Sequence, residues 1–216
     1  QPVTIWPLQD ILNFVFSWPG LVGRMEMWSP LEIIRRSDEY PQAGTTVFAD
    51  AFALKNFGVL SKTLAFSFLS ILTTISLHSP DLIEAITAPN NALLAQIVRD
   101  GHVTIYPRAG PPITLAATVR LAGDDVTLRY WDRRTPSSSE FCCIYCFWLR
   151  HGRADQVMIL RSSAMRQAYE QVSQASCHHR PPAGEVCGGG WLQPVQPAIV
   201  PGLGTYDLVM CVLHAL

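Results

Sequence analysis

The amino-acid sequence predicts an α+β protein with a helical N-terminal half, followed by a mainly antiparallel β-sheet region with one further helix. Two observations predict this fold class. Helix-start and helix-stop signals accompany apolar residues at helical spacing in the first hundred residues, and strict alternation of apolar and polar residues begins after Gly101. The chain is therefore divided into a mainly helical region, 1–101, and a β-rich region with a C-terminal helix and strand, 102–216, with one continuous domain as the alternative.

Two serine–proline motifs predict helix starts in the first region. The Ser-Pro-Leu-Glu motif at Ser29 combines an N-cap, a proline in the first turn and a glutamate that reaches back to the cap. The Ser-Pro-Asp motif at Ser79 has the same design. After it come apolar residues at helical spacing that end at Gly101, a natural helix C-cap. These apolar residues are Leu82, Ile83, Ile86, Leu93, Leu94, Ile97 and Val98.

Residues 63–80 contain no charged side chain, so their length alone makes them a candidate membrane span. Polar side chains nevertheless recur every three or four residues and would form a stripe down one face of a helix. We therefore favour a buried helix in a protein core, with membrane contact through 63–80 as the alternative. The stripe consists of Thr63, Ser67, Ser70, Thr74 and His78.

The second region begins with β-strands. Apolar and other residues alternate over 113–121 and again over 126–131, which predicts a hairpin whose strands bury the same side. Asp124 and Asp125 lie at its tip, where turn formation is more common than catalysis by paired carboxylates. A third strand is expected over 102–106.

The polar residues 133–139 are the best internal boundary by composition. Beyond them we expect a strand over 156–160 and a helix over 163–175. Residues 176–204 are rich in proline and glycine and read as loop. A closing buried strand is expected over 206–213.

Composition narrows the classes of function. Hydrophobic residues make up 49% of the chain and charged residues 15%, with a mean hydropathy of +0.18. This profile is typical of a protein that hides much of its surface, and it argues against intrinsic disorder, which requires high charge and low hydrophobicity. The net charge of −1 provides no strong nucleic-acid signature. All but two of the 16 basic residues, Lys55 and Lys62, are arginines, a pattern compatible with an interface and equally with coding bias.

Segment 143–152 supports three interpretations, of which the first is a zinc site. Cys143 and Cys146 have the spacing of half a tetrahedral site, and Cys177 and Cys187, with two histidines beside the former, would supply the rest. The spacing in the second half matches no standard zinc knuckle. We therefore expect no cofactor, with zinc as the alternative, since buried free cysteines also pack as small hydrophobic residues.

The second interpretation rests on the Arg-His-Gly tripeptide at Arg150, which resembles the histidine phosphatase superfamily. The resemblance implies that His151 accepts a phosphoryl group and that Arg150 binds phosphate. It also implies that Arg166 is a second phosphate ligand, that His214 is the second histidine and that Glu185 is the acid. It covers at most residues 143–216.

The third interpretation places the segment in an apolar core. Only residues 153–155 separate Arg-His-Gly from the next expected strand, whereas neighbouring parallel strands need a crossover of about a dozen residues. A link of this length suits an antiparallel hairpin. Spacing thus favours a core hairpin over a phosphate site.

No P-loop, dinucleotide-binding glycine motif, nucleophile elbow or zinc-protease motif occurs in the sequence. We therefore favour a non-enzymatic structural or assembly subunit that buries apolar surface against other protein subunits. The alternatives are a phosphoryl-transfer enzyme and a zinc-stapled binding module. The chain begins at Gln1, which is compatible with a processed product or an excised segment.

Overall fold

The N-terminal part of the chain is built on a mixed six-stranded sheet, so the predicted helical N-terminal half is wrong. The computed structural model describes residues 4–26, 30–42, 45–62, 67–75, 77, 79–131, 198–203 and 207–210. These residues belong to two units, 1–123 and 124–216. Each unit is described by itself.

The sheet of the first unit has the strand order β1-β4-β3-β2-β6-β5. β2 and β6 run parallel, and every other neighbouring pair in this order is antiparallel. The strands are β1 Thr4–Ile5, β2 Leu31–Gln42, β3 Thr45–Leu54, β4 Ser67–Thr73, β5 His102–Ile105 and β6 Ile113–Gly123.

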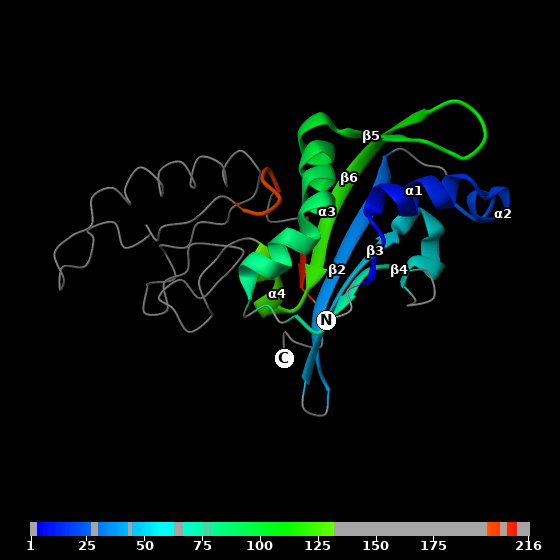
Figure 1. Ribbon diagram of the computed structural model, residues 1–216. Helices are drawn as coiled ribbons and strands as arrows, with labels where there is room; N and C mark the ends of the chain where they lie inside the picture. The colour runs from blue at the N-terminus through cyan, green and yellow to red at the C-terminus, as the bar shows by residue number, and fades with distance from the viewer. Residues whose placement is uncertain are drawn as a thin grey trace, which may run out of the picture. The chain divides into compact units, whose positions relative to one another are not determined.

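Two helices, α1 and α3, lie against one face of this sheet (Figure 1). Their burial patterns explain this arrangement, because α1 (Leu8–Phe16) and α3 (Pro80–Asp100) each direct one side toward the strands. A four-residue helix, α2 (Pro19–Val22), follows α1, and a 3-10 segment, η1 (Lys55–Lys62), follows β3. We call the face of the sheet under α1 and α3 the covered face.

The Ser-Pro-Leu-Glu motif at Ser29 precedes a strand and not the predicted helix. β2 pairs with β3 on one side over ten residue pairs and with β6 on the other over six, and this pairing outweighs a local capping signal. Proline also suits an extended entry to a strand, because its φ angle is compatible with β structure. Alternate residues of β2 from Leu31 onward are buried on the covered face.

The predicted helix over 63–80 is also wrong, since Ser67–Thr73 form β4. Its pairing with β3 shifts register by one residue between Asp50 and Ala51, which inserts Ser70 as a bulge. The bulge leaves Leu69 and Leu72, three residues apart, exposed on the same face. The bulge also interrupts the apolar–polar alternation that indicates a strand. Among the helices of the described ranges, none is long and apolar enough to span a bilayer.

The helix expected after Ser79 is confirmed as α3, and Gly101 is its left-handed C-cap with φ 71°. Ser79 occupies the N-cap position but makes no side-chain capping hydrogen bond. Pro89 lies inside the helix, and α3 bends along its length in Figure 1, as expected where a proline removes one backbone hydrogen bond. The buried positions of α3 are Ile83, Thr87, Asn90, Leu94 and Ile97.

The strands expected over 102–106 and 113–121 are confirmed as β5 and β6. The predicted strand over 126–131 is wrong, because Asp125–Trp131 form the helix α4 of the second unit. Asp124 caps this helix, its Oδ1 accepting the Thr127 N–H at 2.7 Å. β6 therefore pairs with β5 and β2 rather than with the segment that follows it.

In the second unit, α4 is tied to the segment 198–203 by one backbone hydrogen bond, in which Ile199 N–H donates to the Trp131 carbonyl at 3.0 Å. The rings of Tyr130 and Trp131 meet edge to face at 4.9 Å. Within the strand expected over 206–213, Leu208–Met210 form β7. The strand expected over 156–160 and the helix expected over 163–175 lie outside the described residues.

Candidate functional site

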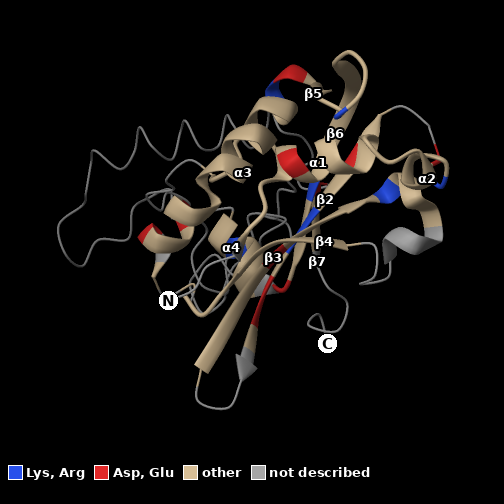
Figure 2. Ribbon diagram, turned by 45° about the vertical axis from the view of Figure 1, so that its right-hand side comes forward, with Lys and Arg blue, Asp and Glu red and all other residues tan. Residues whose placement is uncertain are grey.

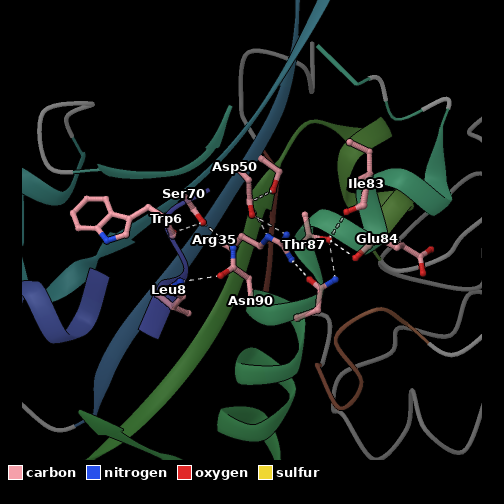
Figure 3. A network of polar contacts seen from close by, with 11 residues as sticks. Trp6, Leu8, Arg35, Asp50, Ser70, Ile83, Glu84, Thr87 and Asn90 are labelled. Carbon is pink, nitrogen blue, oxygen red and sulfur yellow. Dashed lines mark hydrogen bonds and ion pairs between the residues drawn. The ribbon is translucent and has the colours of Figure 1, made fainter. Parts of the chain in front are cut away.

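A buried ion pair lies in the centre of the first unit (Figure 3). The Arg35 guanidinium on β2 donates from Nε to Asp50 Oδ1 at 2.8 Å and from Nη2 to Oδ2 at 2.9 Å. Asp50, on β3, also accepts the Ser37 hydroxyl at 2.7 Å. The fractional exposures of Arg35 and Asp50 are 1% and 0%. Side-on, bidentate geometry is the strongest form of this pairing.

The strands place this pair by simple alternation. Asp50 occupies a covered-face position between Phe48 and Phe52, both fully buried, and Arg35 follows Ile33 on the same face of β2. A charged residue at such a position must be paired, because the free energy of burying an isolated charge is prohibitive. Each of the two residues therefore requires the other.

Helix α3 completes the site with amide and hydroxyl side chains. Asn91 Oδ1 accepts the Arg35 Nη1 hydrogen at 2.6 Å, and Asn91 Nδ2 donates to Thr87 Oγ1 at 3.0 Å. The Thr87 hydroxyl donates to the Ile83 carbonyl one turn earlier at 2.7 Å. We call this set the polar layer; it comprises Arg35, Ser37, Asp50, Thr87, Asn90 and Asn91.

Asn90 connects the polar layer to α1 and to the bulge of β4. Its Oδ1 accepts the Leu8 N–H at 2.8 Å. This contact satisfies a backbone donor in the first turn of α1, because the N-cap residue Pro7 has no side-chain group that could accept it. Asn90 Nδ2 donates to the Ser70 hydroxyl at 2.8 Å, and that hydroxyl donates to the Trp6 carbonyl, also at 2.8 Å. One side chain thus fixes the start of α1 against β4.

The side chains of the polar layer are buried except for the half-buried Asn91, and its two charged members neutralise each other. A substrate needs an accessible group to react with, and the side chains of Arg35 and Asp50 are not accessible. The arrangement holds α3, β2 and β3 in one register, which is a structural role.

One exposed feature of the first unit is a row of aromatic rings that ends in solvent. Phe68, Trp6, Phe14 and Trp18 follow one another with centroid separations of 6.4, 5.4 and 5.6 Å. Trp18 is half-exposed, with a fractional exposure of 50%. Its ring is therefore held on one side by Phe14 and open on the other.

Helix α2 extends this exposed end. None of its residues is buried, although it contains Pro19, Leu21 and Val22, and Figure 1 shows it beyond the end of α1, away from α3. The β5–β6 loop adjoins it, because the Ser17 hydroxyl oxygen accepts the Arg108 N–H at 2.7 Å. We call this region the Trp18 surface; it comprises Trp18, Pro19, Leu21, Val22, Arg24, Tyr106 and Arg108.

Charge is sparse across the first unit, as Figure 2 shows. No acidic residue occurs between Asp10 and Glu26 or between Asp100 and Asp124, the stretches that supply the Trp18 surface. Arg24 and Arg108 are both exposed. The Trp18 surface thus combines apolar side chains with two cations.

One exposed ion pair shifts two pKa values at the end of α3. The hydrogen bond from Arg99 is the main cause that lowers the pKa of Asp100, and the positive charges of Arg99 and His102 act in the same direction. The pKa of Arg99 is raised by the same hydrogen bond. Both groups are open to solvent, so this pair does not mark a buried reactive site.

The site residues suggested by the sequence lie outside the described residues. This holds for the phosphatase-like set, His151, Arg150, Arg166, His214 and Glu185. It holds equally for the zinc-module set, Cys143, Cys146, Cys177 and Cys187. In the ranges that are described, no group of three or more histidine, cysteine, aspartate or glutamate side chains could hold a metal ion.

Sequence reasoning missed the polar layer and the Trp18 surface. One signal for the first is Asp50 between alternating Phe48 and Phe52, a pattern that places the carboxylate inward once a strand is assumed. A signal for the second is Trp18-Pro19-Gly20, where a helix-breaking turn follows aromatic residues.

No protein-family model matches the chain, and no curated protein matches it in sequence.

Proposed function

We propose that this chain is a non-enzymatic assembly subunit that binds another protein through the Trp18 surface. The observation that supports the proposal most directly is the half-exposed Trp18 ring at the end of a packed aromatic row. Tryptophan, tyrosine and arginine are the residues most enriched among those that dominate binding energy at protein interfaces, and all three occur in this surface.

The packing of Trp18 favours binding because the ring is already ordered. Phe14 contacts it at a centroid separation of 5.6 Å, and Phe14 is itself held by Trp6 at 5.4 Å. Binding through a preordered side chain loses less conformational entropy than binding through a mobile one. Helix α2 adds further apolar surface, because none of its residues is buried.

Charge indicates the kind of partner. A twofold interface between identical copies would bring Arg24 and Arg108 toward their own equivalents, and like charges in contact oppose association. A different protein, with acidic residues beside apolar ones, complements this surface better. Low overall charge and high hydrophobicity agree with a role in a larger complex.

The phosphoryl-transfer and zinc hypotheses concern residues outside the described ranges. The contacts described here do not favour either of them.

Site-specific photo-crosslinking tests the proposal. A benzoylphenylalanine in place of Trp18, introduced in the cell that makes the protein, should form one discrete adduct with another protein. The same label in place of Leu82, an apolar side chain with 55% exposure on α3, is the matched control and should not form it.

Two further variants establish whether the adduct reports a specific interface. Trp18→Asp should weaken the isolated complex by at least about 30-fold, the usual effect of losing a central interface tryptophan. Arg24→Glu with Arg108→Glu should weaken it and reduce its salt dependence. Equal adducts from positions 18 and 82, or a complex unaffected by Trp18→Asp, would refute the proposal.

A further inference from the structure

Strand β5 lies at one end of the strand order, so in the described part of the chain one of its sides has no neighbouring strand. It pairs with β6 in continuous antiparallel register from His102 opposite Ala116 to Ile105 opposite Ile113. In such a pair, alternate residues direct their backbone N–H and C=O groups away from the partner strand. An edge of this kind is open to pairing with another chain.

Helix α1 occupies these backbone groups with three polar side chains. Gln9 Nε2 donates to the Thr104 carbonyl at 3.0 Å, and Asn13 Oδ1 accepts the Tyr106 N–H at 2.8 Å. The Ser17 hydroxyl oxygen accepts the Arg108 N–H at 2.7 Å. The contacts therefore fall on every second residue of the chain that runs through and beyond β5.

The spacing of the two elements explains the match. Gln9, Asn13 and Ser17 are four residues apart, a helical rise of about 6 Å per step on one face. Two residues of a strand advance by about 6.8 Å. The three side chains are also linked to one another, since Gln9 Nε2 donates to Asn13 Oδ1 at 3.0 Å and the Ser17 hydroxyl donates to the Asn13 carbonyl at 2.6 Å.

Apart from its length of only four residues and Pro107 just beyond its end, β5 has few protections of its own. Between His102 and Ile105 it contains no lysine, no proline and no shift of register, three of the features that keep an edge strand from pairing. Four fully buried apolar residues hold α1 in place, so the cover is firmly anchored.

We propose that Gln9, Asn13 and Ser17 of α1 keep the edge of β5 from pairing with the β5 edge of a second copy of this chain. The inference goes beyond the proposed function, because it depends on backbone hydrogen bonds and not on the Trp18 ring. In this proposal the polar side chains along one face of α1 prevent one mode of self-association.

Amide hydrogen exchange of the wild-type chain is the first test. The Tyr106 and Arg108 amides should exchange at least about tenfold more slowly than the amide of Ala109 in the same loop, because both are hydrogen-bonded to α1. Equal exchange rates at the three positions would overturn the proposal. This measurement needs no variant and does not depend on whether a variant folds.

Light scattering of a triple variant is the second test. Gln9→Ala with Asn13→Ala and Ser17→Ala keeps helix-forming residues in α1 but removes all three contacts. The purified variant should show a mass that rises with concentration, together with new protection of the Thr104 amide. A mass curve identical to that of wild type, with α1 still folded by circular dichroism, would overturn the proposal. A control with three polar side chains removed from α3, at Asp81, Gln96 and Arg99, should behave as wild type.

Discussion

Replacing Asp50 with alanine should destabilise the protein more than the same replacement of any charged residue on the surface of the first unit. The substitution removes both acceptors of the Arg35 side-on pair, at 2.8 and 2.9 Å, and the acceptor of Ser37. The Asn91 Oδ1 contact at Nη1 does not depend on Asp50. The buried guanidinium would then have lost the carboxylate that pairs with it side-on.

The expected cost follows from that geometry. Removing one partner of a buried pair usually lowers the free energy of unfolding by about 3–5 kcal/mol. Total stabilities are about 5–15 kcal/mol, so Asp50→Ala should abolish a large share of the stability. Urea unfolding of the full chain measures the change in the free energy of unfolding. Hydrogen exchange of the β2 and β3 amides shows whether the loss is located at the pair.

A compensating variant separates charge from shape. Arg35→Met with Asp50→Leu removes both charges at once and should recover most or all of the lost stability, because a buried pair gains little over apolar residues of similar size. A free energy of unfolding of Asp50→Ala within about 1 kcal/mol of the wild-type value would show that the pair is not needed for stability. A double variant as unstable as the single one would show that the loss does not come from the unpaired charge.

Three further predictions concern α3. Gly101→Ala should lower the free energy of unfolding by about 1 kcal/mol, because φ is 71° there, whereas the matched control Gly20→Ala, whose new methyl meets no atom within 4 Å, should change it much less. Leu94→Ala should cost about 2–5 kcal/mol by leaving a cavity in the core, again read from urea unfolding. Arg99→Gln should raise the pKa of Asp100 toward its ordinary value in an NMR titration. Since the native pKa of Asp100 is lowered, its small contribution to stability is present above the unfolded-state pKa and is lost as pH falls through the native one. An unchanged Asp100 titration in Arg99→Gln would contradict this assignment.

Local signals predicted some elements of this fold well. Ser79 and Gly101 bracket α3, and the alternation over 113–121 identifies β6, because each pattern is contained within the element that it describes. The strands of the first hundred residues depend instead on partners far along the chain. Leu31 at the start of β2 pairs with Ala117, and no local pattern contains that information.

The candidate sites were harder to predict for the same reason. In the sequence Asp50 is an isolated charge. Only once β3 is recognised does alternation place it inside the core, opposite Ser37 of β2 and within hydrogen-bond distance of Arg35 on the same strand. The helix over 63–80 was predicted from polar residues at helical spacing, whereas the bulge at Ser70 interrupts the alternation that would have indicated the strand β4.

The mass of the native particle tests the central claim, that this chain is an assembly subunit, most directly. Light scattering and native mass spectrometry of the particle, isolated gently from the cells that make it, should give a discrete mass well above the 23.9 kDa of one chain. A second, more acidic protein should be present at fixed stoichiometry and should be lost in Trp18→Asp. A monodisperse, detergent-free particle of one chain, in wild type and variant alike, would contradict the claim.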